Sequence, residues 1–218
     1  MLDLNFEVCS AEPHAFAAGP TLVFKLRITN GDGANTIHSI LLRCQIQIEP
    51  TRRRYTDVEQ DLLLDLFGEP TRWSQTLRTM LWTHTSTTVG PFTIGKTIDL
   101  QVPCTFDFNV AATKYFAGLE NGEVPLVFQF SGTVFYGTDQ NGLQVAQIPW
   151  SKETRFRLPV RVWSDMMEVY YPNSVWLNLR RDIFDELYRF KIQQGIPTWE
   201  GVMERLLAEK GVKIRDGS

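Results

Sequence analysis

Apolar and polar residues alternate along most of the chain, which is the pattern of β-strands that bury one face. Residues 2–8 and 22–28 follow this period of two, and the second run stops at the turn-forming residues 30–33. Residues 40–48 repeat the pattern and place Cys44 at an inward-facing position. The N-terminal part of the chain therefore predicts three strands.

Further strands are predicted over residues 77–89, 98–108, 126–136, 143–150 and 154–163. We expect the first two of these to pair with each other across a connection centred near Ile94. Pro159 cannot donate to a ladder, so the last strand is expected at a sheet edge, and Gly132 is expected to mark a bulge or a close backbone approach. Because strands do not alternate with helices, the predicted fold class is mainly β, an antiparallel β-sandwich of about eight strands.

Residues 57–67 depart from this alternation and place apolar side chains at helical spacing. Thr56 can cap a helix at its start and Gly68 can end one, so we predict a short helix inserted between strands. Residues 110–119 are compatible with either a helical turn or a loop.

The longest helical pattern lies at the C-terminal end of the chain. Asn173 or Ser174 can cap a helix that carries Trp176 on its apolar stripe. A second helix, capped by Thr198, carries Trp199 on its own stripe. Two helices joined this closely predict an αα-hairpin.

The apolar stripes of the hairpin must be covered, because burial of each large side chain stabilises by about 2–3 kcal/mol. We expect the hairpin to pack on the sandwich as a lid, and a docking arm for another protein is the alternative. The predicted division is residues 1–164 for the sandwich and 165–218 for the hairpin, within the same structural domain. The sequence leaves self-association open.

Composition narrows the class of protein. The 218 residues are 43% hydrophobic and 22% charged, which is ordinary for a folded domain. A net charge of -3 argues against a nucleic-acid partner. With no signal-like N-terminus, no long apolar run for a membrane, and three cysteines at long spacings, we expect a cytoplasmic protein.

His84 and Cys104 are the candidate residues for chemistry. If the two strands around Ile94 pair with each other, these side chains face one another, and a thiol beside an imidazole can be a nucleophile or a pair of metal ligands. The alternative is a buried structural cysteine and a hydrogen-bonded histidine. No cofactor is predicted.

The run Arg52–Arg54, with Tyr55 and the nearby Trp73, is a candidate surface for an anion or an acidic partner, because arginine binds carboxylates and stacks on aromatic rings. The alternative is a solvated loop whose arginines pair with neighbouring acids. Adding the arginine and aromatic residues of the hairpin, the predicted partner-binding set is Arg52, Arg53, Arg54, Trp73, Trp176, Arg180, Tyr188 and Trp199.

Enzyme signatures are absent from the sequence, which contains no nucleophile elbow, no zinc-protease helix, no phosphate-binding loop and no CxxC pair. The acidic residues between 57 and 65 lack the glycine and closing glutamate of a calcium loop. We therefore predict a protein that is not an enzyme.

Several short strings mark this sequence, at residues 48–50, 52–55, 65–73, 81–84, 102–108, 131–135, 149–153, 180–182, 188–191 and 197–199. They resemble those of an uncharacterised family of bacterial, largely actinobacterial, proteins of unknown function. Some members of that family are encoded beside nickel-iron hydrogenase genes. The resemblance implies an accessory or assembly role, and it implies no catalytic residue.

Together these observations predict a non-catalytic protein-interaction, accessory or assembly factor whose partner is another protein, with a hydrogenase-related one as the specific case. The alternative is an enzyme or metal-handling protein that uses His84 and Cys104 or the arginine-rich loop. A carrier with a ligand pocket between the sheets is a third hypothesis.

Overall fold

The structure is a computed structural model that describes residues 3–31, 33, 35–105, 110–138, 142–175 and 177–212. The chain forms two compact units, Met1–Ser174 and Val175–Ser218.

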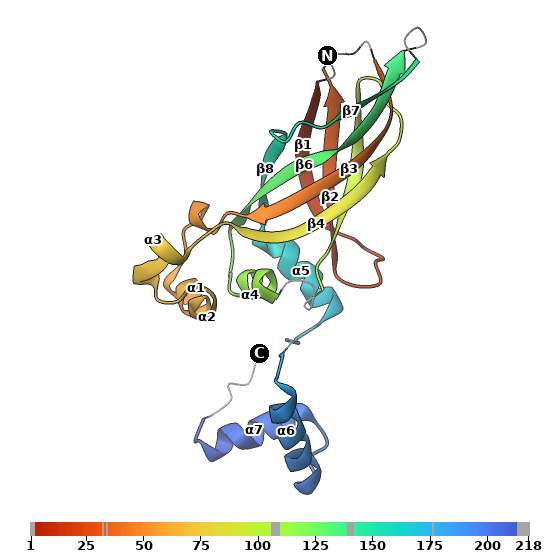
Figure 1. Ribbon diagram of the computed structural model, residues 1–218. Helices are drawn as coiled ribbons and strands as arrows, with labels where there is room; N and C mark the ends of the chain where they lie inside the picture. Colours follow the sequence, from red (N-terminus) through yellow and green to blue (C-terminus); the bar gives the residue numbers. More distant parts are fainter. Residues whose placement is uncertain are drawn as a thin grey trace. The chain divides into compact units, whose positions relative to one another are not determined.

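The first unit contains two antiparallel sheets, which confirms the predicted mainly β fold (Figure 1). Sheet A has the order β1-β2-β5, with β1 at Leu4–Pro13, β2 at Thr21–Asn30 and β5 at Gly95–Pro103. Sheet B has the order β4-β3-β6, with β7 and β8 both pairing with β6. Its strands are β3 (Thr36–Ile48), β4 (Met80–Val89), β6 (Glu123–Thr138), β7 (Gly142–Gln147) and β8 (Glu153–Pro159).

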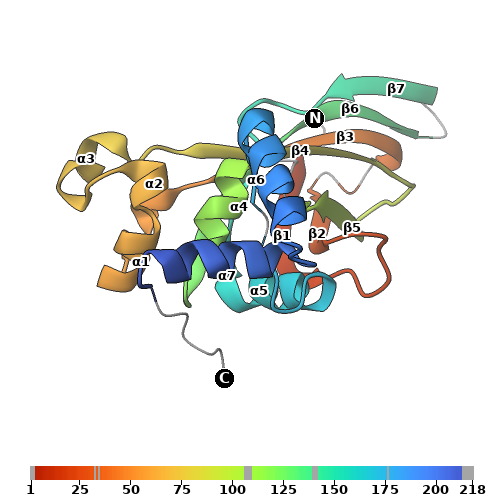
Figure 2. The same ribbon diagram turned by 90° about the horizontal axis from the view of Figure 1, so that it is seen from below.

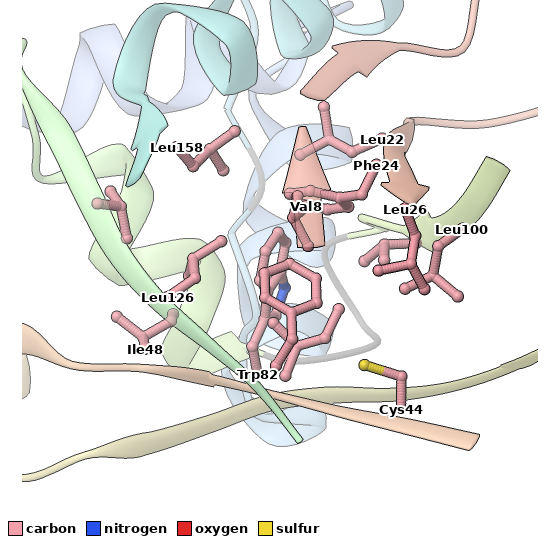
Figure 3. Packing of buried hydrophobic residues seen from close by; sticks show 14 of the residues in the cluster. Val8, Leu22, Phe24, Leu26, Cys44, Ile48, Trp82, Leu100, Leu126 and Leu158 are labelled. Carbon is pink, nitrogen blue, oxygen red and sulfur yellow. The ribbon is translucent and has the colours of Figure 1, made fainter. Parts of the chain in front are cut away.

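The alternating apolar residues of the two sheets form one core (Figure 3). Phe6 of β1 stacks on Phe130 of β6 with ring centroids 4.4 Å apart, and Phe24 of β2 meets Phe128 of β6 edge to face at 5.0 Å. Cys44 is 1% exposed and points into this core, as its place in the alternation predicted. The period of two therefore identified the buried faces of β1, β2 and β3.

β6 is the central strand of sheet B. One of its edges pairs with β3 over almost its whole length, and the other edge pairs with β8 near its start and with β7 near its end. Gly132 lies between these two regions with a φ of 137°, and a Cβ built there would lie 2.0 Å from the carbonyl oxygen of Leu41. The predicted close backbone approach at this glycine is confirmed.

The predicted pairing of the strands around Ile94 is wrong. β4 pairs with β3 and β5 pairs with β2, so the two strands belong to different sheets. The connection crosses from one sheet to the other because Phe92 is buried and exchanges both backbone hydrogen bonds with Ile37, at 2.8 and 3.0 Å. β4 and β5 are still neighbours, and the Thr85 hydroxyl of β4 donates to the Gln101 carbonyl of β5 at 2.9 Å.

The predicted inserted helix is present but broken. It consists of α1 (Asp57–Leu62) and α2 (Leu64–Phe67), followed by the short helix α3 (Trp73–Thr76). Thr56 caps α1 as predicted, with its hydroxyl accepting from the Glu59 backbone amide. Residues 110–117, for which the sequence allowed a loop, form helix α4 (Val110–Ala117). The helices of this unit gather at one end of the strands (Figure 1).

The last predicted strand ends earlier than expected. β8 stops at Pro159, at the edge of sheet B as predicted, and α5 (Val160–Tyr170) follows at once. Pro159 has the φ of -60° that its ring imposes and is the N-cap of the helix, while the Val160 amide donates to the Gly122 carbonyl at 2.9 Å. Val160 and Trp163 are buried at helical spacing, so Val160 and Val162 continue the strand pattern only by coincidence.

The second unit contains α6 (Arg181–Gln193) and α7 (Trp199–Glu209), which are the two helices of the predicted hairpin. Thr198 caps α7 as predicted, but α6 begins at Arg181 and not after Asn173 or Ser174. Asn173 has a positive φ of 51°, which lies outside the right-handed helical region. The backbone at this residue therefore does not begin a helix.

Trp176 lies outside the described residues. The packing of the hairpin on the sandwich, and their union in one structural domain, stay predictions. Within the described part of the chain, none of the helices combines the length and the apolar character that a membrane span requires.

Candidate functional site

Four arginines line one open hollow of about 640 Å³ on the first unit. Arg52, Arg53 and Arg54 belong to the segment before α1, and they were predicted as a candidate surface. Arg157 of β8 joins them, although the chain places it a hundred residues later. The same hollow is lined by only two acidic residues, Glu59 and Glu123, so its charge is positive in a chain whose net charge is -3.

Arg53 is the fixed member of this group. Its side chain is 7% exposed and forms an ion pair with the buried Glu59. Nη1 donates to the Glu123 carbonyl at 3.1 Å and Nη2 donates to the Asn121 carbonyl at 2.8 Å. The guanidinium also lies over the Tyr55 ring, 5.5 Å from its centroid. Arg53 therefore joins the arginine-rich segment to the loop before β6 and cannot swing out to a ligand.

Glu59 accepts hydrogen bonds from three directions. Besides the ion pair with Arg53, its carboxylate accepts from the Thr56 amide at 3.1 Å and from the Glu120 amide at 3.0 Å. A buried charge is tolerated only when its partners satisfy it in this way. The pair of Arg53 and Glu59 thus holds the base of the hollow.

The other three arginines are exposed around that base. Arg52 contacts Glu49 with 3.1 Å between Nε and Oε2, and Arg157 lies 3.9 Å from Glu123. Arg54 is exposed, and no ion pair of it occurs among the described residues. Guanidinium groups bind carboxylates and phosphates through paired hydrogen bonds, so this arrangement suits an anion.

His84 and Cys104 are not brought together. His84 is exposed on sheet B, where its Nε2 lies 3.0 Å from the Gln45 side-chain oxygen. Cys104 is buried after β5 and its thiol donates to the Val102 carbonyl at 3.3 Å. Burial raises the pKa of the Cys104 thiol to about 12, so the thiol stays protonated at neutral pH.

The sequence pattern of DUF6084, described as a family of unknown function, matches residues 1–215. The chain belongs to this family. Membership in DUF6084 agrees with the resemblance found in the sequence and assigns no chemistry to any residue. No curated protein sequence matches the chain.

In this DUF6084 chain, Trp73 is buried, unlike the exposed arginines of the hollow. It is 8% exposed, its indole donates to the Gly68 carbonyl at 2.8 Å, and its ring meets Tyr55 and Phe67 edge to face. Trp73 is therefore part of the core under the arginine-rich segment and is not available at the surface.

The candidates in the second unit form a cluster of their own. Tyr188 is half-exposed and stacks with Phe184 of the same helix, and Trp199 of α7 lies 5.1 Å from Phe184 between ring centroids. The Lys191 ammonium lies 5.9 Å from the centre of the Trp199 ring. Arg180 is exposed and pairs with Asp182 at 2.9 Å. The contacts of Phe184, Tyr188 and Lys191 with Trp199 join α6 to α7.

Metal ligands do not gather in the described ranges of the chain, where no group of three His, Cys, Asp or Glu side chains could hold an ion. Of the acidic residues between 57 and 65, Glu59 pairs with Arg53 and Asp65 pairs with Lys114. Sequence reasoning missed Arg157 as part of the hollow. The alternating arginines of residues 155–161 did indicate a basic face in the sequence. Only the pairing of β8 with β6 shows that this face lies beside the arginines at positions 52–54.

Proposed function

We propose that the protein is a non-catalytic binding protein that recognises an acidic segment of another protein through the arginine-lined hollow. The observation that carries this proposal is the convergence of Arg157 with the arginines at positions 52–54 around one hollow. We further propose that it serves as an accessory or assembly factor in a bacterial cytoplasm. A hydrogenase-related partner is the specific case suggested by the resemblance of the sequence.

The difference between the buried Arg53 and the exposed arginines around it supports binding of a partner. Arg53 is held rigidly, so the base of the hollow is formed before any partner arrives and little conformational entropy is lost on binding. The side chains of Arg52 and Arg157 are 53% and 62% exposed, so they can reach a partner from the rim. Exchange of their weak surface pairs for carboxylates of a partner costs little.

The volume of the hollow favours a peptide segment over a single small anion as the bound ligand. A volume of about 640 Å³ holds several side chains. Carboxylates match the forked geometry of guanidinium groups, and like charges would exclude a basic segment. An enzyme or metal-handling role through His84 and Cys104 remains a prediction to which their separate surroundings lend no support.

The test is charge reversal at the exposed arginines. We expect the double variant Arg54→Glu/Arg157→Glu to lose at least about tenfold in affinity for a fluorescein-labelled oligoglutamate peptide, measured by anisotropy. The affinity of the unaltered protein should fall as salt is added, because rim charges are screened. Both substituted side chains are exposed, so the fold should be retained, as circular dichroism would show.

Arg78→Glu is the matched control. Arg78 is exposed, lies in the loop before β4 and does not line the hollow. Equal affinity of the peptide for the double variant and for Arg78→Glu would refute the proposal, and so would an unaltered protein that does not bind the peptide at low salt.

A further inference from the structure

We infer that the free edge of β7 is the surface through which two copies of this chain pair, so that their B sheets join into one continuous antiparallel sheet. This inference is independent of the arginine-lined hollow.

The other sheet edges in the described part of the first unit are each approached by a neighbouring strand. The edge of β4 meets β5 through the hydrogen bond from Thr85 to Gln101. The edge of β8 faces β1, and Lys152 before β8 pairs with Asp3 before β1 at 2.9 Å. β7 pairs with β6 on one side, and in the described ranges no strand pairs with it on the other. Figure 2 shows β7 as the outermost strand of sheet B.

An edge strand of this kind normally carries a device against pairing, such as a lysine, a proline or an inward-pointing charge. β7 has the sequence Gly-Leu-Gln-Val-Ala-Gln and contains none of these. Its Leu143 and Val145 are 66% and 58% exposed and lie on the same face of the sheet. Three residues after the strand, Trp150 is 92% exposed. The edge therefore offers unpaired backbone groups beside apolar side chains.

The occupant that fits best is a second copy of the same strand. Between Glu123 and Lys152, Asp139 is the only charged residue in the sequence, so this edge has no charge pattern that would select an oppositely charged partner. Two identical antiparallel strands satisfy each other's backbone groups, and a neutral strand brings no like charges together when it meets itself. Such a pairing is isologous and closes as a dimer.

The position of Trp150 adds to this self-complementarity. In a two-fold antiparallel pair, the end of one β7 lies beside the start of the other. With Val145 of each copy opposite Val145 of the other, Trp150 of one copy lies just beyond the Gly142 start of β7 in the second copy. Large aromatic side chains of this kind supply much of the binding energy at interfaces.

The test is the oligomeric state of the full chain, measured by sedimentation velocity over a concentration series. We expect a monomer–dimer equilibrium whose dissociation constant rises at least about tenfold in Val145→Lys, because each new ammonium would face its counterpart across the pair. Trp150→Ala should also weaken the dimer, and its exposure means that folding does not depend on it. Ile94→Lys, at a position that is 77% exposed and away from β7, should dimerise as the unaltered protein does.

Backbone amide exchange provides a second measurement. The amides of β7 should exchange more slowly as protein concentration rises, while those of β4 should not change. A chain that stays monomeric over the whole series would overturn the inference and would leave a strand from another protein as the occupant of the edge. A dimer that Val145→Lys and Trp150→Ala leave intact would overturn it as well.

Discussion

At the scale of single residues, the hydrogen bond between the hydroxyl groups of Tyr55 and Tyr115 has a direction that can be assigned. The Tyr55 hydroxyl donates its only proton to the Pro50 carbonyl at 2.8 Å. The hydroxyl of Tyr115, 2.9 Å from that of Tyr55, must therefore be the donor between the two. Burial raises the pKa of Tyr55 to about 12 and also raises the pKa of Tyr115, so both groups keep their protons at neutral pH.

This direction predicts unequal effects of removing either hydroxyl. Tyr115→Phe removes one hydrogen bond and should lower the free energy of unfolding by about 1 kcal/mol. Tyr55→Phe leaves both the Tyr115 donor and the Pro50 carbonyl without a partner, and should cost about 2–3 kcal/mol. Urea denaturation of the two variants measures both values. Equal losses would show that the direction assigned to the pair is wrong.

The exposed residues of the candidate site could be predicted more readily than the buried ones. A run of three arginines is visible in any sequence, so positions 52–54 were identified at once. The burial of Arg53 depends on Glu59 and on carbonyls of residues 121 and 123, which are close only in the folded chain. Trp73 was included in the candidate surface because arginine can stack on an aromatic ring, whereas its ring is covered by Tyr55 and Phe67.

At the scale of elements, buried polar contacts of Arg53 and Glu59 attach the helical insert to the loop before β6. Glu59 lies in the first turn of α1, within a capping box, and it accepts from Arg53 and from the Glu120 amide before β6. The position of α1 is thus tied to the start of β6 by polar contacts that are almost fully buried.

Removal of one partner of this ion pair should lower the free energy of unfolding much more than removal of both partners. Glu59→Ala leaves the Arg53 guanidinium buried and unpaired, and should lower the free energy of unfolding by about 3–5 kcal/mol. The double variant Arg53→Met/Glu59→Leu removes both charges and should be clearly more stable than Glu59→Ala.

Glu69→Ala, at an exposed position near α3, is the control and should change stability by less than about 0.5 kcal/mol. Thermal or urea unfolding followed by circular dichroism gives all three values. A double variant no more stable than Glu59→Ala would mean that packing, and not the unpaired charge, dominates the loss.

Strands and helices were predicted well where their hydrophobic pattern extends over many residues. They were predicted less well at the junctions between elements. The alternation in β1, β2 and β3 reflects one buried face and needs no tertiary information. The step from β8 to α5 was missed because Val160 and Val162 prolong the alternation while Pro159 already starts a helix. Whether β4 pairs with β5 depends on the buried Phe92, whose partner Ile37 is distant in sequence.

At the scale of the whole molecule, the core of the first unit is formed by residues of that unit. The buried apolar cluster runs from Leu4 in β1 to Met166 in α5, and it includes side chains from both sheets and from α4. A unit that contains its own core of this size can fold independently.

We therefore expect a chain that ends at Ser174 to keep the fold of the sandwich. Its near-ultraviolet circular dichroism should match the corresponding part of the full-length signal, and its unfolding should stay cooperative. If the hairpin is instead the lid that the sequence predicts, the shortened chain should lose several kcal/mol of stability and bind a hydrophobic dye. Comparing the partners that the full and shortened chains retain from native cells would show whether the hairpin serves binding.

The central place of β6 also has a consequence for biosynthesis. β3 and β6 are paired along most of their lengths, with Cys44 opposite Phe130, yet the ribosome makes β3 long before β6. At a synthesis rate of about 5–20 residues per second, the edge of β3 that pairs with β6 waits on the order of 4 to 20 seconds for its partner strand. The nascent chain is exposed to aggregation during this interval, and a chaperone that shields β3 would then determine how much of the protein reaches its native state.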